Sequence, residues 1–94
     1  MSLLLYLNNM QIDYKPTFIR AYKKLPPELQ LEVKEKLQLF KDLSNHERLR
    51  VHKLHGPLKQ FYSFSLTYAH RAVFYYETKQ NVIMVDLGDH NSYR

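Results

Sequence analysis

The chain has 94 residues, a formal net charge of +5 and no cysteine. This length allows one domain with a modest core. An apolar share of 45%, with eight tyrosines and five phenylalanines, argues against disorder. Without cysteine there are no disulfides, no thiolate zinc sites and no cysteine nucleophile. The pI near 9.5 favours a polyanionic partner, most simply nucleic acid.

The N-terminal stretch "MSLLLYLNNM" has some features of a signal peptide. Its apolar run, from Leu3 to Leu7, is too short for the hydrophobic region of such a peptide, and no basic residue precedes it. No other segment approaches membrane-spanning length. We therefore expect a cytoplasmic protein with an N-terminal extension over residues 1–9 and a single domain over residues 10–94.

The first elements of the domain are predicted to be a short strand and a helix. Polar and apolar residues alternate over Gln11–Tyr14, which predicts an edge strand that ends before Pro16. From Thr17 to Leu25 the apolar residues recur at helical spacing and share one face. These residues are Phe18, Ile19, Tyr22 and Leu25.

A second helix is predicted from Pro27 to about Leu43. The sequence "LPPE" interrupts the first helix, whereas Pro27 suits the first position of a new one and Glu28 complements its dipole. Glu32 and Lys36 form an i,i+4 pair on its polar side. Its buried stripe is predicted to contain Leu29, Val33, Leu37 and Phe40. The two helices should form a hairpin.

The spacing of apolar residues changes to strand periodicity in the second half of the chain. The segment Phe61–Tyr68 predicts a strand with Tyr62, Phe64 and Leu66 on one face and a wet or functional face made of Ser63, Ser65 and Thr67. Further strands are expected over His70–Glu77 and Asn81–Leu87, separated by the turn "TKQN". The predicted fold is α+β, in the order β-α-α-β-β-β, with the helical hairpin packed on a twisted, mainly antiparallel sheet.

The segment "HERLRVHKLHGPLKQ" is the most basic stretch of the chain. A solvated, charged connection is the ordinary interpretation of such a run. The alternative is a phosphate-binding surface whose histidines move protons near neutral pH. Its histidines are His46, His52 and His55, and its cationic residues are Arg48, Arg50, Lys53 and Lys59.

Arg71 lies between apolar neighbours in "AHRAVFYY", on the same strand face as Val73 and Tyr75. An arginine in a central strand needs a partner for its guanidinium. The partner could be the carboxylate of Glu77 or Asp86, or a bound anion.

Two other kinds of site are weaker candidates. His52 and His55, with Asp89 and His90, could supply metal ligands, but no helical HExxH pattern is present and the ligands come from distant loops. A serine hydrolase is weaker still, because no nucleophile elbow surrounds the serines. The serines considered are Ser63, Ser65 and Ser92.

The stretch "LHGPLKQFYSFSLTYAHRAVFYYE", followed by "VIMVDLGDHNSYR", resembles the RelE/ParE superfamily of bacterial toxins from type II toxin–antitoxin pairs. The pattern is most similar to the RelE-like mRNA interferases and covers about residues 10–94. The resemblance implies a RelE-like fold and cleavage of mRNA without metal or cofactor, usually in the ribosomal A site. A base takes the proton of the ribose 2′-OH, which attacks the adjacent phosphate, while an acid protonates the departing 5′-oxygen.

Carried over by residue, the resemblance makes Arg71 the phosphate clamp, His90 the general acid and Tyr93 an aromatic that stacks on or orients the nucleotide. Either His52 or His55 stands in the region of the general base. Some relatives carry lysines on the strand where this chain has serines, at positions 63 and 65, and this departure favours histidine acid–base chemistry. The RNA-binding residues are expected to be Lys53, Arg48, Arg50 and Lys59.

The resemblance also implies partners and leaves alternatives. The expected partners are a cognate antitoxin, mRNA and the ribosome, with no membrane; the toxin alone should be a monomer and the complex a hetero-oligomer. Exposed apolar positions among Phe18, Tyr22 and Leu39 are predicted to contact the antitoxin. The alternatives are a ParE-like DNA gyrase poison and an RNA-binding module without catalysis.

Overall fold

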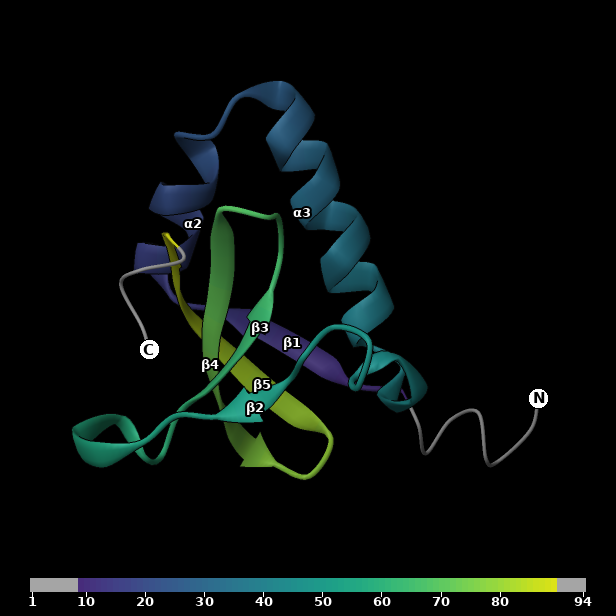
Figure 1. Ribbon diagram of the computed structural model, residues 1–94, viewed down its shortest axis with the longest axis vertical. Coiled ribbons are helices and arrows are strands. Elements are labelled where there is room, and N and C mark those ends of the chain that lie inside the picture. The colour runs from purple at the N-terminus through teal and green to yellow at the C-terminus, as the bar shows by residue number, and fades with distance from the viewer. Residues whose placement is uncertain (1–8, 90–94) are drawn as a thin grey trace.

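The computed structural model describes residues 9–89, in which two helices lie against one five-stranded sheet (Figure 1). No helix in this part of the chain is long and apolar enough to span a membrane. The helices and strands, in chain order, are β1 (Gln11–Tyr14), α2 (Pro16–Lys23), α3 (Pro27–Phe40), β2 (His52–Lys53), β3 (Tyr62–Ser65), β4 (His70–Thr78) and β5 (Asn81–Asp89).

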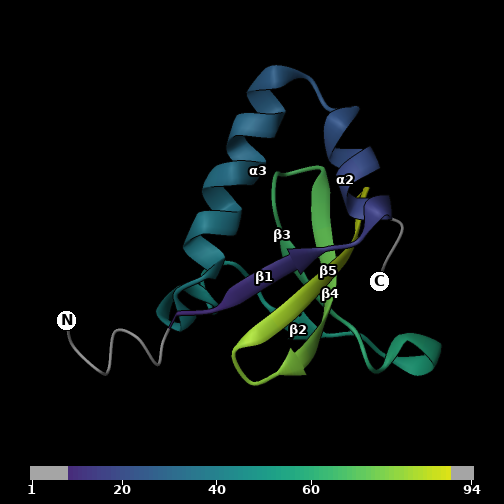
Figure 2. The same cartoon turned by 180° about the vertical axis from the view of Figure 1, so that it is seen from behind.

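The sheet has the strand order β1-β5-β4-β3-β2. The last three strands form the predicted antiparallel meander. The first strand, β1, pairs in parallel with the last strand, β5, with Gln11 opposite Asn81 (Figure 2). A two-residue strand, β2, adds to the free edge of β3. The predicted order β-α-α-β-β-β is therefore confirmed, and β2 is an addition to it.

Prolines begin both helices, as Pro16 in α2 and Pro27 in α3. The second helix ends at Phe40 rather than near Leu43, because the following residues form a capped turn. The Asp42 carboxylate accepts hydrogen bonds from the backbone N–H of Ser44 at 3.0 Å and from its hydroxyl at 2.8 Å. These two bonds hold the pKa of Asp42 below its usual range.

An aromatic cluster around Phe40 forms the centre of the core between helices and sheet. The Phe40 ring stacks on Phe64 at 4.5 Å between ring centroids and meets the edge of Phe74 at 5.0 Å. His46 stacks on the same ring at 4.4 Å, and its Nε2 lies 2.8 Å from the Phe40 carbonyl oxygen. Since a carbonyl only accepts, Nε2 carries the proton, and His46 is a structural residue.

The predicted antitoxin contacts are the exposed positions among Phe18, Tyr22 and Leu39, and Phe18 is not one of the exposed positions. Its side chain is 1% exposed and belongs to the main core, whereas Ile19, predicted on the same face, is 36% exposed. Phe18 is the one fully buried residue of the short helix α2, which packs against β5. Tyr22 and Leu39 are half-buried and pack on the core.

The prediction of a wet face on β3, made of Ser63, Ser65 and Thr67, is wrong for two of these three residues. This strand ends at Ser65, and both Ser63 and Thr67 are buried. The reason is a second apolar layer on the side of the sheet away from the helices. There the chain after β2 folds back, with the Leu54 N–H bonded to the Phe61 carbonyl at 2.9 Å. Among the described residues, the buried apolar ones outside the main core are Leu54, Val73 and Ile83.

Candidate functional site

The side of the sheet that faces away from α2 and α3 is called the open face because neither helix covers it, although Ser63 and Val73 on this side are buried under the second apolar layer. Side chains alternate along a strand, and the core side of β4 holds Ala72 and Phe74. Arg71, Val73 and Tyr75 therefore belong to the open face, as the sequence predicted. Paired residues of neighbouring strands share a face, which adds Ser65, the partner of Arg71.

Register brings His52 and Arg71 to this same open face. His52 pairs with Ser63, and two residues further along β3 Ser65 pairs with Arg71. Two strand spacings across and two residues along correspond to about 12 Å between the Cα atoms of His52 and Arg71. Ser63 and Val73, both buried, lie between these two positions on the same face.

The imidazole of His52 is held in one tautomer. Its Nδ1 lies 2.8 Å from the carbonyl oxygen of Arg50. Because that oxygen can only accept, Nδ1 carries the proton in the neutral ring and Nε2 keeps its lone pair. Arg50 has a φ of 60°, a left-handed conformation that turns the chain just before β2. The exposed His52 is therefore oriented to accept a proton at Nε2.

The basic segment is divided between two places. His55 precedes a short 3-10 helix, Gly56–Leu58, and Lys59 follows it. Since β2 and β3 are antiparallel, this helix lies toward the Tyr62 end of β3, away from Ser65 and Arg71. It projects from the body of the molecule in Figure 1. Lys53 is exposed beside His52. The structure therefore brings His52, but not His55, toward Arg71.

Arg48 and Arg50 line a groove of about 360 Å³ between α3 and the β3–β4 turn. We call it the hairpin-tip groove. Lys36 lines it from α3, and Tyr68, which is 93% exposed, stands at the tip of the turn. Ser65 also lines the groove, so that the groove adjoins the position of Arg71 across the β3–β4 pair. Sequence analysis did not single out Tyr68 or Lys36 as site residues.

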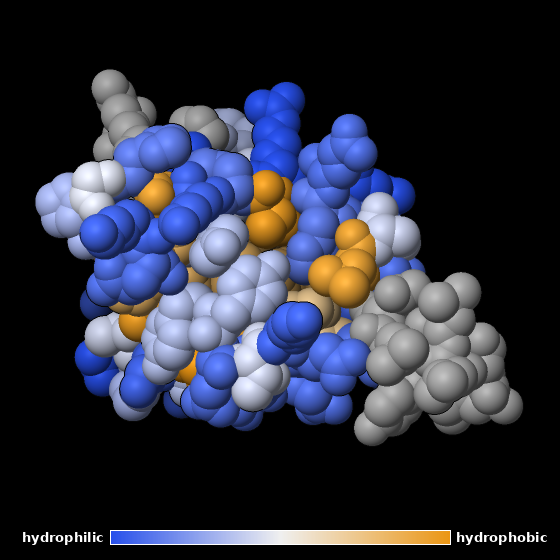
Figure 3. Space-filling model, turned by 90° about the horizontal axis from the view of Figure 1, so that it is seen from below, coloured by the Kyte–Doolittle hydropathy of each residue, from blue (hydrophilic) through white to orange (hydrophobic). Residues whose placement is uncertain are grey.

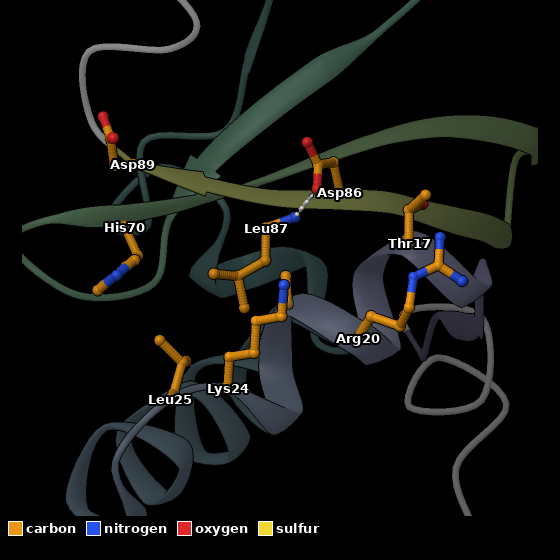
Figure 4. Close-up of a pocket in the computed structure, with 9 residues that line it drawn as sticks. Thr17, Arg20, Lys24, Leu25, His70, Asp86, Leu87 and Asp89 are labelled. Carbon is orange, nitrogen blue, oxygen red and sulfur yellow. Dashed lines mark hydrogen bonds between the residues drawn. The ribbon is translucent and has the colours of Figure 1, made fainter.

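A second pocket, of about 410 Å³, lies between α2 and the ends of β4 and β5 (Figure 4). Arg20 approaches it from α2, Lys24 from the residue just after this helix, and His70 lines it from β4. Thr67 Oγ1 accepts from the backbone N–H of Ala69 and of His70, so its hydroxyl proton points to His70 Nδ1, 2.9 Å away. Neutral His70 therefore carries its proton on Nε2. The histidine had not been predicted as a site residue.

Of the two proposed ionic partners of Arg71, Glu77 is too far away. It lies six residues further along the same strand, which corresponds to about 20 Å. Its Oε1 instead accepts a hydrogen bond from the Asn81 side chain at 3.4 Å. Asp86 is on the neighbouring strand, opposite Val73.

His90 and Tyr93, the predicted general acid and nucleotide-stacking residue, lie outside the described residues. The same holds for Ser92. Among residues 9–89, no three side chains of His, Asp or Glu gather closely enough to hold a metal ion. Asp89 pairs with His70 at the end of β5, three strands away from His52. His52 and Asp89, two of the candidate metal ligands, are therefore separated.

The lower surface is mostly hydrophilic, with small separate apolar spots between polar and aromatic residues (Figure 3). Scattered apolar residues of this kind are normal for protein surfaces. On the helices the exposed apolar residues are Ile19 and Leu31, the latter 60% exposed.

Neither a known protein-family profile nor a curated protein matches the chain. Solved structures do. The toxin–antitoxin complex RelBE2 of Mycobacterium tuberculosis contains a chain with TM-score 0.70 and 21% identity, covering 87% of this chain and 99% of that one. The archaeal RelE–RelB complex of Pyrococcus horikoshii OT3 contains a chain with TM-score 0.69 and 15% identity, which covers 89% of this chain and 98% of that one. YafQ of E. coli has a TM-score of 0.61 and 15% identity, with 86% of this chain and 93% of that one covered. The fold is therefore the RelE-like α+β fold, as predicted.

Proposed function

We propose that this protein is the toxin of a type II toxin–antitoxin pair and cleaves mRNA on the ribosome without a metal ion. The observation that carries the proposal is the placement of His52 and Arg71 on one face of the sheet, with their Cα atoms about 12 Å apart. The fold shared with RelE and YafQ structures supports it. A ribonuclease of this kind needs no serine or cysteine nucleophile, because RNA supplies its own 2′-OH.

His52 acts as the general base in this proposal. Its Nε2 accepts the proton of the 2′-OH, and the 2′-oxygen then attacks the adjacent phosphorus. The guanidinium of Arg71 binds the phosphate oxygens and stabilises the charge that develops on them. The bond from phosphorus to the 5′-oxygen breaks, which leaves a 2′,3′-cyclic phosphate and a 5′-hydroxyl.

His90 donates the proton to the departing 5′-oxygen in this proposal, and Tyr93 stacks on the nucleotide. Both assignments come from the resemblance, since these residues lie outside the described part of the chain. What supports them is the course of β5. The strand continues to Asp89, which pairs with His70, next to the pair formed by Arg71 and Gly88. His90 is the next residue in the sequence.

The proposed partners are a cognate antitoxin, mRNA and the ribosome, in the cytoplasm, with the toxin alone a monomer and its complex a hetero-oligomer. The RelBE2 structure is that of a toxin–antitoxin complex, and the Pyrococcus structure is that of a RelE–RelB complex. With Phe18 buried, the exposed apolar residues on the helices, Ile19 and Leu31, are better candidates for antitoxin contact.

Primer extension on total RNA after induced expression tests the proposal. The wild type should cut translated transcripts, and His52→Ala should lose about 100-fold or more of this cleavage, the usual contribution of a general base. His55→Ala should retain it, because that residue lies toward the other end of β3. His90→Ala should also lose cleavage. Intact transcripts with arrested growth would contradict the proposal and favour gyrase poisoning, which a supercoiling assay would then detect.

A further inference from the structure

The lining of the hairpin-tip groove has more positively charged side chains than negatively charged ones. Its lining includes three cations, Lys36, Arg48 and Arg50, and one carboxylate, Glu32. Glu32 already pairs with Lys36, with Oε1 and Nζ 3.7 Å apart. Within residues 9–89, neither arginine forms an ion pair, and both are exposed. Two guanidinium groups are thus available to an anionic ligand at one place.

The aromatic ring at the tip is presented by a firmly bonded turn. The backbone N–H groups of Leu66 and Thr67 both donate to the carbonyl of His70, at 2.9 and 3.1 Å. The buried Thr67 hydroxyl accepts two further backbone N–H groups. From α3, Lys36 Nζ donates to the Leu66 carbonyl at 3.2 Å. Tyr68 is therefore an exposed ring on a fixed backbone, which costs little entropy to use in binding.

We propose that the hairpin-tip groove is a second nucleotide subsite for single-stranded RNA. An unpaired base stacks on Tyr68, and a backbone phosphate lies between Arg48 and Arg50. An exposed aromatic beside guanidinium groups is the combination that binds single-stranded nucleic acid without reading its sequence. An acidic peptide would use the arginines but would gain little from the ring.

The subsite lies beside the proposed catalytic face. Ser65 lines the groove and pairs with Arg71, one strand spacing of about 4.8 Å away. The carbonyl that orients His52 belongs to Arg50, which lines the groove. The inference rests on the proposed function for its ligand: the groove holds a nucleotide that neighbours the one between His52 and Arg71, and so keeps the strand in place for cleavage.

Fluorescence anisotropy with a labelled single-stranded oligoribonucleotide of about ten residues tests the subsite. The protein carries His52→Ala so that it does not cut the probe. Tyr68→Ala should weaken binding by about 5- to 100-fold, while Tyr68→Phe, which keeps the ring, should bind like its parent. Arg48→Gln and Arg50→Asn should each lower the slope of log affinity against log salt by about 0.7. Asparagine tolerates the left-handed backbone at position 50.

Lys79→Ala is the matched charge control for the arginines. Lys79 lies in the β4–β5 turn, at the far end of β4 from Tyr68. Lys79→Ala should lower the RNA affinity less than Arg48→Gln or Arg50→Asn does. It should also change the salt slope by less than these variants do. Because Tyr68 is almost fully exposed, Tyr68→Ala should keep the melting temperature of its parent.

The outcomes separate this inference from the proposed nuclease. Unchanged RNA affinity in Tyr68→Ala overturns the subsite, even if the wild type cuts mRNA. Weakened affinity in Tyr68→Ala supports the subsite, even if the wild type cuts no mRNA in cells. Polyglutamate that binds as tightly as RNA and is insensitive to Tyr68→Ala would overturn the subsite in favour of a peptide site.

Discussion

Removing the buried hydroxyl of Ser63 should raise the free energy of unfolding, whereas removing that of Thr67 should lower it. Ser63 is 0% exposed, and its Oγ has no hydrogen-bond partner within residues 9–89. Burying an unpaired hydroxyl costs about 1–3 kcal/mol by mutational measurements. Ser63→Ala removes that cost and loses one oxygen's packing, so the free energy of unfolding should rise by about 1 kcal/mol.

Thr67 differs because its Oγ1 accepts from the backbone N–H groups of Ala69, at 3.1 Å, and His70, at 3.0 Å. Thr67→Val keeps the shape of the side chain, leaves the Ala69 N–H without this acceptor, and leaves the His70 N–H only its 3.4 Å bond to the Thr67 carbonyl. The free energy of unfolding should therefore fall by about 1–3 kcal/mol. In a domain of this size, 1 kcal/mol corresponds to about 4–8 °C in Tm.

Thermal unfolding followed by circular dichroism measures both effects. Ser65→Ala is the control, because Ser65 is a half-buried serine on the same strand and should change stability by no more than about 0.5 kcal/mol. A Ser63→Ala protein that melts lower than the wild type would refute the argument. It would mean that the Ser63 hydroxyl has a partner, such as a bound water, and contributes to stability.

Two further predictions concern the core and the turn after α3. Phe40→Ala should lower the free energy of unfolding by about 3–5 kcal/mol in urea titrations, because it empties the centre of the aromatic cluster; a loss below about 1 kcal/mol would contradict that assignment. Asp42→Asn should be less stable than the wild type near neutral pH, because the folded state lowers the pKa of Asp42. The difference should disappear as the pH falls through that lowered pKa, and a difference in stability that does not change with pH would contradict it.

The elements that the sequence predicted well are those with strong local signals. Pro16 and Pro27 sit at the first positions of the helices, where their missing N–H costs nothing. Alternation of polar and apolar residues predicted β1, and apolar runs predicted β4 and β5. The ends of all three strands lie within two residues of the prediction. The parallel pairing of β1 with β5 could not be derived locally, because it joins segments about 70 residues apart.

The errors arose where the environment of a residue depends on distant segments. Ser63 alternates with Tyr62 and Phe64 as a solvent-facing residue would, but the segment with Leu54 and Phe61 folds over it. The same limit applies to the site. The basic segment was visible in the sequence, whereas only the register of β2 on β3 separates His52 from His55 and places it toward Arg71. No Gly, Pro, Asn or Asp marks the turn at Tyr68, and the apolar alternation predicted a strand that continues to this residue.

The chemistry of the RNA ends tests the central claim most directly. Translated mRNA incubated with the purified protein and ribosomes is cut, and the new 5′ ends are labelled with polynucleotide kinase with and without prior phosphatase treatment. Attack by the 2′-OH, with His52 as base and Arg71 on the phosphate, predicts 5′-hydroxyl ends that label without phosphatase and are absent with Arg71→Ala. Ends that label only after phosphatase, or no cleavage by the wild type, would contradict it.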